Sequence, residues 1–173
     1  DDIYISYSTP KTPSRTFIYN LKTKEKKLVK EQIIPSGHNS NDYIVERLEC
    51  EGHDGRIIPI TITRKKTSKL DGNSNLLLYG YGSYGNSMWP SFSSTRLSLI
   101  NRDIIWATAH IRGGMERGMK WWKEGKLLNK KNTFKDYISC AKFLIDKKYT
   151  SKKKIIGMGG SAGGLLMGAV VNE

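Results

Sequence analysis

The chain has 173 residues, 38% of them hydrophobic, which is enough apolar content for one packed domain or slightly more. Its formal net charge of +13 raises the question of nucleic-acid binding, but the lysines are spread over turns and the ends of predicted elements. We therefore expect a solvated, lysine-rich surface and no nucleic-acid partner. No apolar stretch approaches the roughly 18 residues of a membrane span, so neither a signal peptide nor a membrane partner is predicted.

The two cysteines bear on disulfides, metal sites and the cellular compartment, and the first residues bear on whether the chain is a fragment. Cys50 and Cys140 lie in unrelated segments without C-x-x-C spacing. We therefore expect no disulfide framework, metal or organic cofactor, and a reducing cytoplasm as the compartment. The sequence does not open on an initiator methionine. We expect it to be a fragment of a longer polypeptide.

The first forty residues alternate in the manner of short antiparallel strands. Strands are predicted at residues 3–7, 16–21 and 27–29, with polar turns at residues 9–14 and 22–24. Short strands at this spacing are typical of a sandwich, barrel or propeller. Three strands are too few to close such an architecture.

The next segment, residues 41–75, is predicted to form a β-hairpin followed by a linker. Residues 43–50 and 57–63 are strand-like, and Asp54 and Gly55 between them provide the positive φ of a tight reversal. Residues 65–75 are polar and contain a further Asp-Gly-Asn turn sequence.

Beyond residue 75 the pattern changes to apolar strands alternating with helices, which indicates an α/β fold with a buried parallel or mixed sheet. Strands are predicted at residues 76–79 and 104–109. A helix is predicted to start at a cap on Asn132 or Thr133, with Thr133 and Asp136 as a capping box. Its apolar face has helical spacing and consists of Phe134, Tyr137, Ile138, Ala141, Leu144 and Ile145.

A G-x-S-x-G sequence at residues 159–163 is the most informative motif. It lies between a predicted strand at 154–158 and a predicted helix at 165–171, so Ser161 is placed at the apex of a sharp turn that exposes its hydroxyl. Such a serine is a candidate nucleophile, and the N–H of Ala162 would face a developing oxyanion.

Two glycine runs, at residues 80–85 and 157–162, loosely match a dinucleotide-binding pattern. Neither is followed by both the helix and the acidic residue that such a site requires, so nucleotide binding is not expected.

Four motifs in order resemble the prolyl oligopeptidase family of serine peptidases, and within it the oligopeptidase B (protease II) group. They occupy residues 78–85, 109–114, 125–134 and 160–166. The resemblance implies that residues 76–173 form the N-terminal part of an α/β-hydrolase catalytic domain with a partial sheet. In outline it also implies that residues 1–40 are antiparallel strands like the end of a β-propeller.

The resemblance also implies roles for individual residues. Ser161 matches the nucleophile, the Ala162 amide and the Tyr81 hydroxyl match the oxyanion donors, and Tyr84 matches a position that lines the substrate pocket. The implied activity is hydrolysis of short peptides after basic residues through an acyl-enzyme. The alternatives are another α/β-hydrolase, such as an esterase or acyl-hydrolase, and a non-catalytic remnant or split subunit that pairs with a complementary C-terminal segment.

The base that activates the serine is not identified in this sequence. In α/β-hydrolases the acidic residue and the histidine follow the nucleophile, whereas all three histidines here precede it: His38, His53 and His110. We therefore predict a structural role for His110, and we expect Arg112 and Glu116 to orient the loop after that strand through charge-assisted hydrogen bonds. Because the triad Asp and His are absent, this chain alone is predicted to be inactive.

Overall fold

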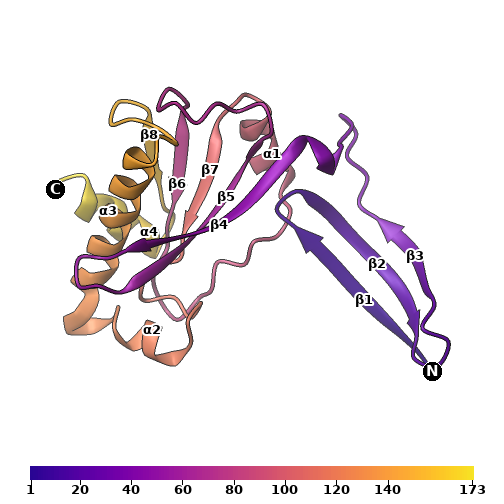
Figure 1. The fold of residues 1–173 in the computed structure, drawn as a ribbon. Helices are drawn as coiled ribbons and strands as arrows, with labels where there is room; N and C mark the ends of the chain where they lie inside the picture. Colours follow the sequence, from indigo (N-terminus) through magenta and orange to yellow (C-terminus); the bar gives the residue numbers. More distant parts are fainter.

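The computed structural model describes residues 1–173 and contains two β-sheets (Figure 1). The first sheet has three antiparallel strands in the order β1 (Asp2–Thr9), β2 (Thr12–Asn20), β3 (Lys26–Glu31). The second has five strands in the order β4-β5-β7-β6-β8, with bounds β4 (Tyr43–Glu51), β5 (Ile57–Lys65), β6 (Leu76–Tyr79), β7 (Ile105–Ala109) and β8 (Ile155–Met158). The predicted succession of antiparallel strands and an α/β region with a mixed sheet is confirmed.

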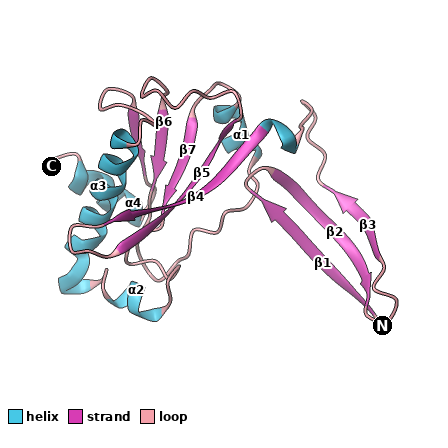
Figure 2. Ribbon diagram, viewed as in Figure 1, coloured by secondary structure: helices cyan, strands magenta, loops and turns pink.

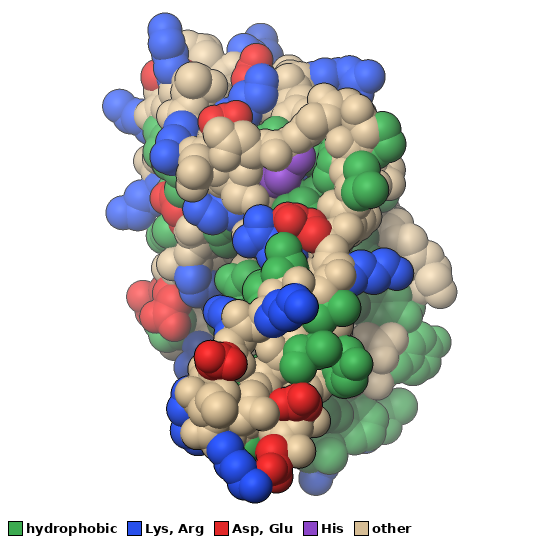
Figure 3. Space-filling model, turned by 90° about the vertical axis from the view of Figure 1, so that its right-hand side faces the viewer, with side chains coloured by type: hydrophobic (Ala, Val, Ile, Leu, Met, Phe, Trp, Pro, Cys, Tyr) green, Lys and Arg blue, Asp and Glu red, His purple; other side chains and the backbone are tan.

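The three-stranded sheet projects away from the five-stranded one (Figure 1). Several of its apolar side chains are exposed to solvent: Ile3, Tyr4, Ile5, Tyr7, Leu28 and Val29. Figure 3 views the molecule from this side, where Lys and Arg side chains are scattered among acidic and apolar ones. The basic residues on this face do not gather into one continuous patch.

Strand β2 begins earlier than predicted. Residues 9–14 were expected to form a turn, but only Pro10 and Lys11 separate β1 from β2. Proline lacks the N–H that a ladder position requires, and Pro13 falls where the register between β1 and β2 shifts and has no partner of its own. The irregularity accommodates the proline, so the strand continues through it.

The five-stranded sheet combines an antiparallel hairpin with a parallel half. Strands β4 and β5 pair antiparallel, β5 pairs antiparallel with β7, and β6 pairs parallel with both β7 and β8. The hairpin predicted at residues 43–63 therefore extends the same sheet that carries the later strands.

Helices cover both faces of this sheet (Figures 1 and 2). The long helix α3 (Lys130–Asp146) and α4 (Ala162–Val170) pack on one face, and α1 (Ser94–Ile100) packs on the other. The sequence did not predict α1, the short helix α2 (Met119–Lys123), or two 3-10 turns, η1 (Ser40–Asp42) and η2 (Leu127–Asn129). None of the helices is both long and apolar enough to cross a membrane.

Strand alternation divides the apolar side chains between two cores. In β6, Leu76 and Leu78 join the larger core under α3 and α4, whereas Leu77 joins the smaller core under α1. The larger core consists mainly of strand residues and one face of α3, including Ile58, Ile60, Ile62, Ile105, Ala107, Tyr137, Cys140, Leu144 and Leu166. The Tyr137 hydroxyl donates to the Leu78 carbonyl at 2.6 Å and so ties α3 to β6.

The predicted start of α3 is wrong. The helix begins at Lys130, with Asn129 at the N-cap position, rather than after a cap on Asn132 or Thr133. The Thr133 hydroxyl donates to the Arg112 carbonyl at 2.8 Å, and the Asp136 carboxylate accepts hydrogen bonds from Arg112. Both side chains therefore bind the loop after β7, and no capping box forms.

Candidate active site

Ser161 lies on a three-residue turn between β8, which ends at Met158, and α4, which begins at Ala162. Its backbone has φ 54° and ψ −118°, outside both the helical and the extended regions, and the residue is exposed. Backbone strain of this kind amounts to about 1–3 kcal/mol and persists only where the surroundings impose it. The structure therefore has the sharp strand-to-helix bend with an exposed serine at its apex.

The parallel pairing of β6 with β8 brings a second loop beside this turn. Tyr79 pairs with Met158, so both strands end at the same edge of the sheet, and the Gly80 N–H donates to the Met158 carbonyl at 3.1 Å. A Cβ on Gly163 would lie 2.9 Å from the Gly80 carbonyl oxygen and 3.6 Å from the Tyr81 ring. Only glycine permits this approach, which places Tyr81 against the first turn of α4.

The Tyr81 loop presents a second aromatic side chain to solvent. The ring of Tyr84 lies 6.5 Å from that of Tyr81, its backbone has φ 58°, and the residue is 76% exposed. The end of the loop is held by the Gly85 N–H, which donates to the Gly113 carbonyl at 2.9 Å. Tyr84 is thus an accessible aromatic surface beside Tyr81.

The N-terminus of α4 provides an electropositive backbone group beside Ser161. The N–H groups of Gly163 and Gly164 bond to the carbonyls of Gly160 and Ser161, both at 2.8 Å. Ala162 is the first helical residue, and the N–H groups at a helix start have no intrahelical acceptor and lie at the positive end of the helix dipole. A hydroxyl, a helix-start amide and a phenol therefore share one edge of the sheet, an arrangement suited to polarising a carbonyl.

Arg112 fixes the neighbouring loop, as the sequence predicted, through an ion cluster that the sequence did not reveal. Arg112 is 1% exposed, and its Nε donates to Asp136 Oδ2 at 2.8 Å while its NH1 donates to Asp54 Oδ2 at 2.6 Å. Desolvation would lower the pKa of Arg112, but its hydrogen bonds to both carboxylates raise the pKa overall. Burial raises the pKa of Asp136, and the hydrogen bonds from Arg112 oppose that shift.

The Arg112 cluster also accounts for the convergence of acidic groups at this point. His53, Asp54 and Asp136 place ligand-type atoms within 4.8 Å of one another. The Arg112 guanidinium lies between the two carboxylates and donates hydrogen bonds to both, so the group is explained as an ion cluster.

His110 occupies the structural position that was predicted for it. It is buried at the end of β7, with Nε2 2.8 Å from Thr61 Oγ1 and Nδ1 3.5 Å from Glu116 Oε1. Glu116 Oε1 also accepts the Met88 N–H at 2.9 Å. The pair therefore connects β5 and β7 to the loop before α1. Glu116 was expected to orient the loop after β7, and its contact with the loop before α1 was not predicted.

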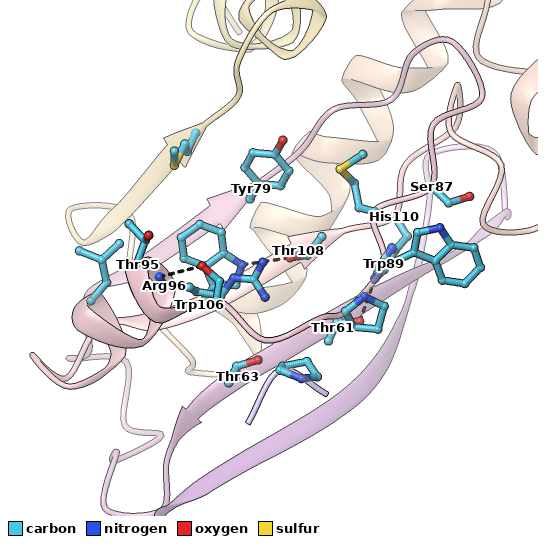
Figure 4. Close-up of a pocket in the computed structure, with 16 residues that line it drawn as sticks. Thr61, Thr63, Tyr79, Ser87, Trp89, Thr95, Arg96, Trp106, Thr108 and His110 are labelled. Atoms are coloured by element: carbon cyan, nitrogen blue, oxygen red, sulfur yellow. Dashed lines mark hydrogen bonds between the residues drawn. The ribbon is translucent and has the colours of Figure 1, made fainter. Parts of the chain in front are cut away.

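A hollow of about 410 Å³ on the α1 side of the sheet is separate from the serine turn (Figure 4). Thr61 and Thr108 point toward it from the strands, His110 lies at one end, and the Arg96 guanidinium covers the Trp106 ring at 4.9 Å. Neither the serine nor the Tyr81 loop lines this hollow. Its lining does include Tyr79 and Met158, the last residues of β6 and β8.

The sequence did not predict two further sets of contacts. Lys130 reaches the loop after β6, with Nζ 2.6 Å from the Gly82 carbonyl oxygen. Cys50 and Cys140, which lie in unrelated segments of the sequence, meet in the core with sulfurs 3.6 Å apart, and both are free thiols. These contacts join residues far apart in the chain, and no local sequence pattern signals them.

A mixed sheet with a strained serine on a strand-to-helix turn defines an α/β-hydrolase scaffold. Residues 90–173 match the profile of the prolyl oligopeptidase family. Over 173 residues the chain is 45% identical to dipeptidyl aminopeptidase BI of Pseudoxanthomonas mexicana, covering 99% of this chain and 24% of that protein. It is 41% identical over 172 residues to protease 2 of Moraxella lacunata, covering 99% of this chain and 25% of that protein.

The structural comparison agrees with the sequence comparison. Oligopeptidase B from Leishmania major superimposes with a TM-score of 0.91 at 40% identity, covering 99% of this chain and 24% of that one. The chain belongs to the prolyl oligopeptidase family, and the likeness includes the first forty residues as well as the motif-rich part. The chain spans about a quarter of the length of the curated relatives that it matches.

Proposed function

We propose that the complete gene product containing this chain is a serine peptidase that cleaves short peptides through an acyl-enzyme on Ser161. The observation that carries the proposal is the strained, exposed Ser161 at the N-terminus of α4, beside the Tyr81 loop. Ser161 Oγ attacks the scissile carbonyl carbon while its proton passes to a base. The Ala162 N–H and the Tyr81 hydroxyl donate to the resulting oxyanion. The proton then passes to the departing amine, and water hydrolyses the acyl-enzyme.

The base belongs to a segment other than these residues. His110 is buried and bonded to Thr61, His38 stacks on Tyr43 with ring centroids 5.1 Å apart, and no hydrogen bond reaches the Ser161 hydroxyl. We propose that a histidine and its acidic partner come from a further, complementary segment. The 173 residues alone are then expected to hydrolyse no peptide, because removing one triad member lowers kcat by up to about 10⁶-fold.

We propose that the substrate carries a basic residue before the scissile bond and that Tyr84 lines its binding site. The support is the likeness to protease 2 and oligopeptidase B, together with the exposed aromatic surface of Tyr84 beside Tyr81. Prolyl endopeptidases are also among the relatives, at 39% identity for the Dictyostelium discoideum protein, so proline substrates are the natural comparison.

The test measures kcat/KM of the complete gene product on three matched substrates: an arginyl peptide amide, a prolyl peptide amide and a short acyl ester. The expected result is highest activity on the arginyl amide and loss of all amide hydrolysis in Ser161→Ala. Equal or higher activity on the prolyl amide would refute the basic-residue preference alone. Amide hydrolysis that survives Ser161→Ala, or activity restricted to esters, would refute the peptidase assignment.

A further inference from the structure

Lys130 is a half-buried lysine at the first position of α3 whose ammonium group is directed into the loop after β6. Its Nζ donates to the Gly82 carbonyl at 2.6 Å and to Ser83 Oγ at 2.8 Å. No carboxylate lies within 4.0 Å of this Nζ, and the centroid of the Phe134 ring is 5.9 Å away. The ammonium group therefore donates its hydrogen bonds to this loop and forms no ion pair.

The contacted residues lie between the two tyrosines of the candidate site. Hydrogen bonds to the rest of the protein hold the two ends of the loop, at Gly80 through the Met158 carbonyl and at Gly85 through the Gly113 carbonyl. The middle of the loop is held from outside by the two hydrogen bonds from Lys130. The peptide group between Gly82 and Ser83, one residue beyond Tyr81, is thus held by one side chain from α3.

A half-buried position is unfavourable for the charged Lys130 side chain unless its hydrogen bonds to the loop compensate for the lost hydration. Desolvation by burial lowers the pKa of Lys130, and no acidic partner offsets the loss of hydration. Hydrogen bonds from a charged donor are shorter and stronger than neutral ones, so this ammonium holds the Gly82 carbonyl firmly. An exposed lysine one turn further along α3, Lys135, makes no such contact and serves as a matched comparison.

We propose that Lys130 is a positioning residue for the peptidase reaction, holding the loop so that the Tyr81 hydroxyl meets the oxyanion on the carbonyl attacked by Ser161. This inference rests on the proposed function. An oxyanion donor is effective at about 2.7–3.1 Å from the developing charge, and a displacement of about 1 Å lowers the rate by roughly 10²-fold. Lys130 acts through the tyrosine and does not touch the substrate.

A double-mutant cycle on the complete gene product tests the inference. Lys130→Met is expected to lower kcat by about 10- to 100-fold with KM changed by less than about threefold, because the contact matters in the transition state. In a Tyr81→Phe background the same substitution is expected to lower kcat by less than about threefold, since the donor it positions is already gone. Lys130→Arg, which keeps the charge and the donors, is expected to recover most of the rate, and Lys135→Met is expected to match the wild type.

The outcomes separate the inference from the function on which it rests. Peptide hydrolysis that survives Ser161→Ala refutes the proposed function. If Ser161→Ala is inactive but Lys130→Met behaves like Lys135→Met, or lowers kcat equally with and without the Tyr81 hydroxyl, Lys130 is not a positioning residue and the peptidase assignment stands. Should Lys130→Met fail to unfold cooperatively, the cycle is run with Lys130→Gln, which keeps a shorter neutral donor, and the same criteria apply.

Discussion

Replacing Asp136 with asparagine tests the ion cluster that holds the loop between β7 and α2. Asp136 is 0% exposed and accepts three hydrogen bonds from Arg112: from the backbone N–H at 3.0 Å, from Nε at 2.8 Å and from NH2 at 2.5 Å. The Asp136→Asn side chain has nearly the same shape but no charge, and one of its two terminal atoms is an NH₂ donor facing the guanidinium. The buried cation then keeps only Asp54, which is partly exposed.

The expected loss of stability follows from this geometry. Removing one partner of a buried ion pair destabilises proteins by about 3–5 kcal/mol. Because NH1 and NH2 of Arg112 still bond to Asp54, at 2.6 Å and 3.1 Å, we expect the lower end of that range, about 3 kcal/mol.

Thermal and denaturant unfolding of the complete gene product, followed by circular dichroism, measure the loss. Asp146→Asn is the matched control, because Asp146 is exposed near the end of the same helix, and it is expected to change stability by less than about 0.5 kcal/mol. A loss below about 1 kcal/mol for Asp136→Asn, or equal losses for the two variants, would refute the argument that the cluster stabilises this part of the fold.

Three further predictions concern the site and its surroundings. Ser161→Gly should be about 1 kcal/mol more stable than Ser161→Ala, because glycine adopts the φ of 54° without strain. This gain exceeds the cost of the larger conformational entropy that glycine gives the unfolded chain. Identical Tm values for the two variants would contradict the strain. Desolvation raises the pKa of Asp54, but hydrogen bonding to Arg112 outweighs it and the pKa is lowered. The stability that Asp54 contributes is therefore present above the unfolded pKa of about 3.9 and is lost as pH falls through the folded pKa. The difference in Tm between the wild type and Asp54→Asn should narrow between about pH 5 and pH 3. A difference that stays constant over this range would contradict the stabilising role of the Asp54 carboxylate. Tyr81→Phe should lower kcat by about 10²- to 10³-fold with little change in KM, whereas a change confined to KM would assign the phenol to substrate binding instead.

Local patterns predicted the elements that depend on local chemistry. The strand, the glycine-rich turn and the helix around Ser161 are contiguous, so the sharp bend could be inferred without knowledge of distant residues. The Asp54 and Gly55 turn likewise predicted the hairpin of β4 and β5. Helical spacing placed Tyr137 and Leu144 on the apolar face of α3, and both lie in the larger core.

The predictions that were wrong or missing involve long-range contacts. Thr133 and Asp136 have the sequence of a helix cap, yet Arg112, more than twenty residues earlier, captures both side chains, and α3 starts at Lys130 instead. Helix α1 was missed because its apolar residues are few and follow a polar segment that contains Pro90. Lys130 is one of many lysines in the sequence, and only the fold distinguishes it from the solvated ones.

Covalent labelling tests the central claim most directly. The complete gene product is treated with a fluorophosphonate probe, digested, and analysed by mass spectrometry, with Ser161→Ala treated in parallel. We predict a single adduct on Ser161 and none in the variant, because only this hydroxyl has the strained turn and the adjacent oxyanion donors. Labelling of another serine, or peptide hydrolysis without any adduct on Ser161, would contradict the account.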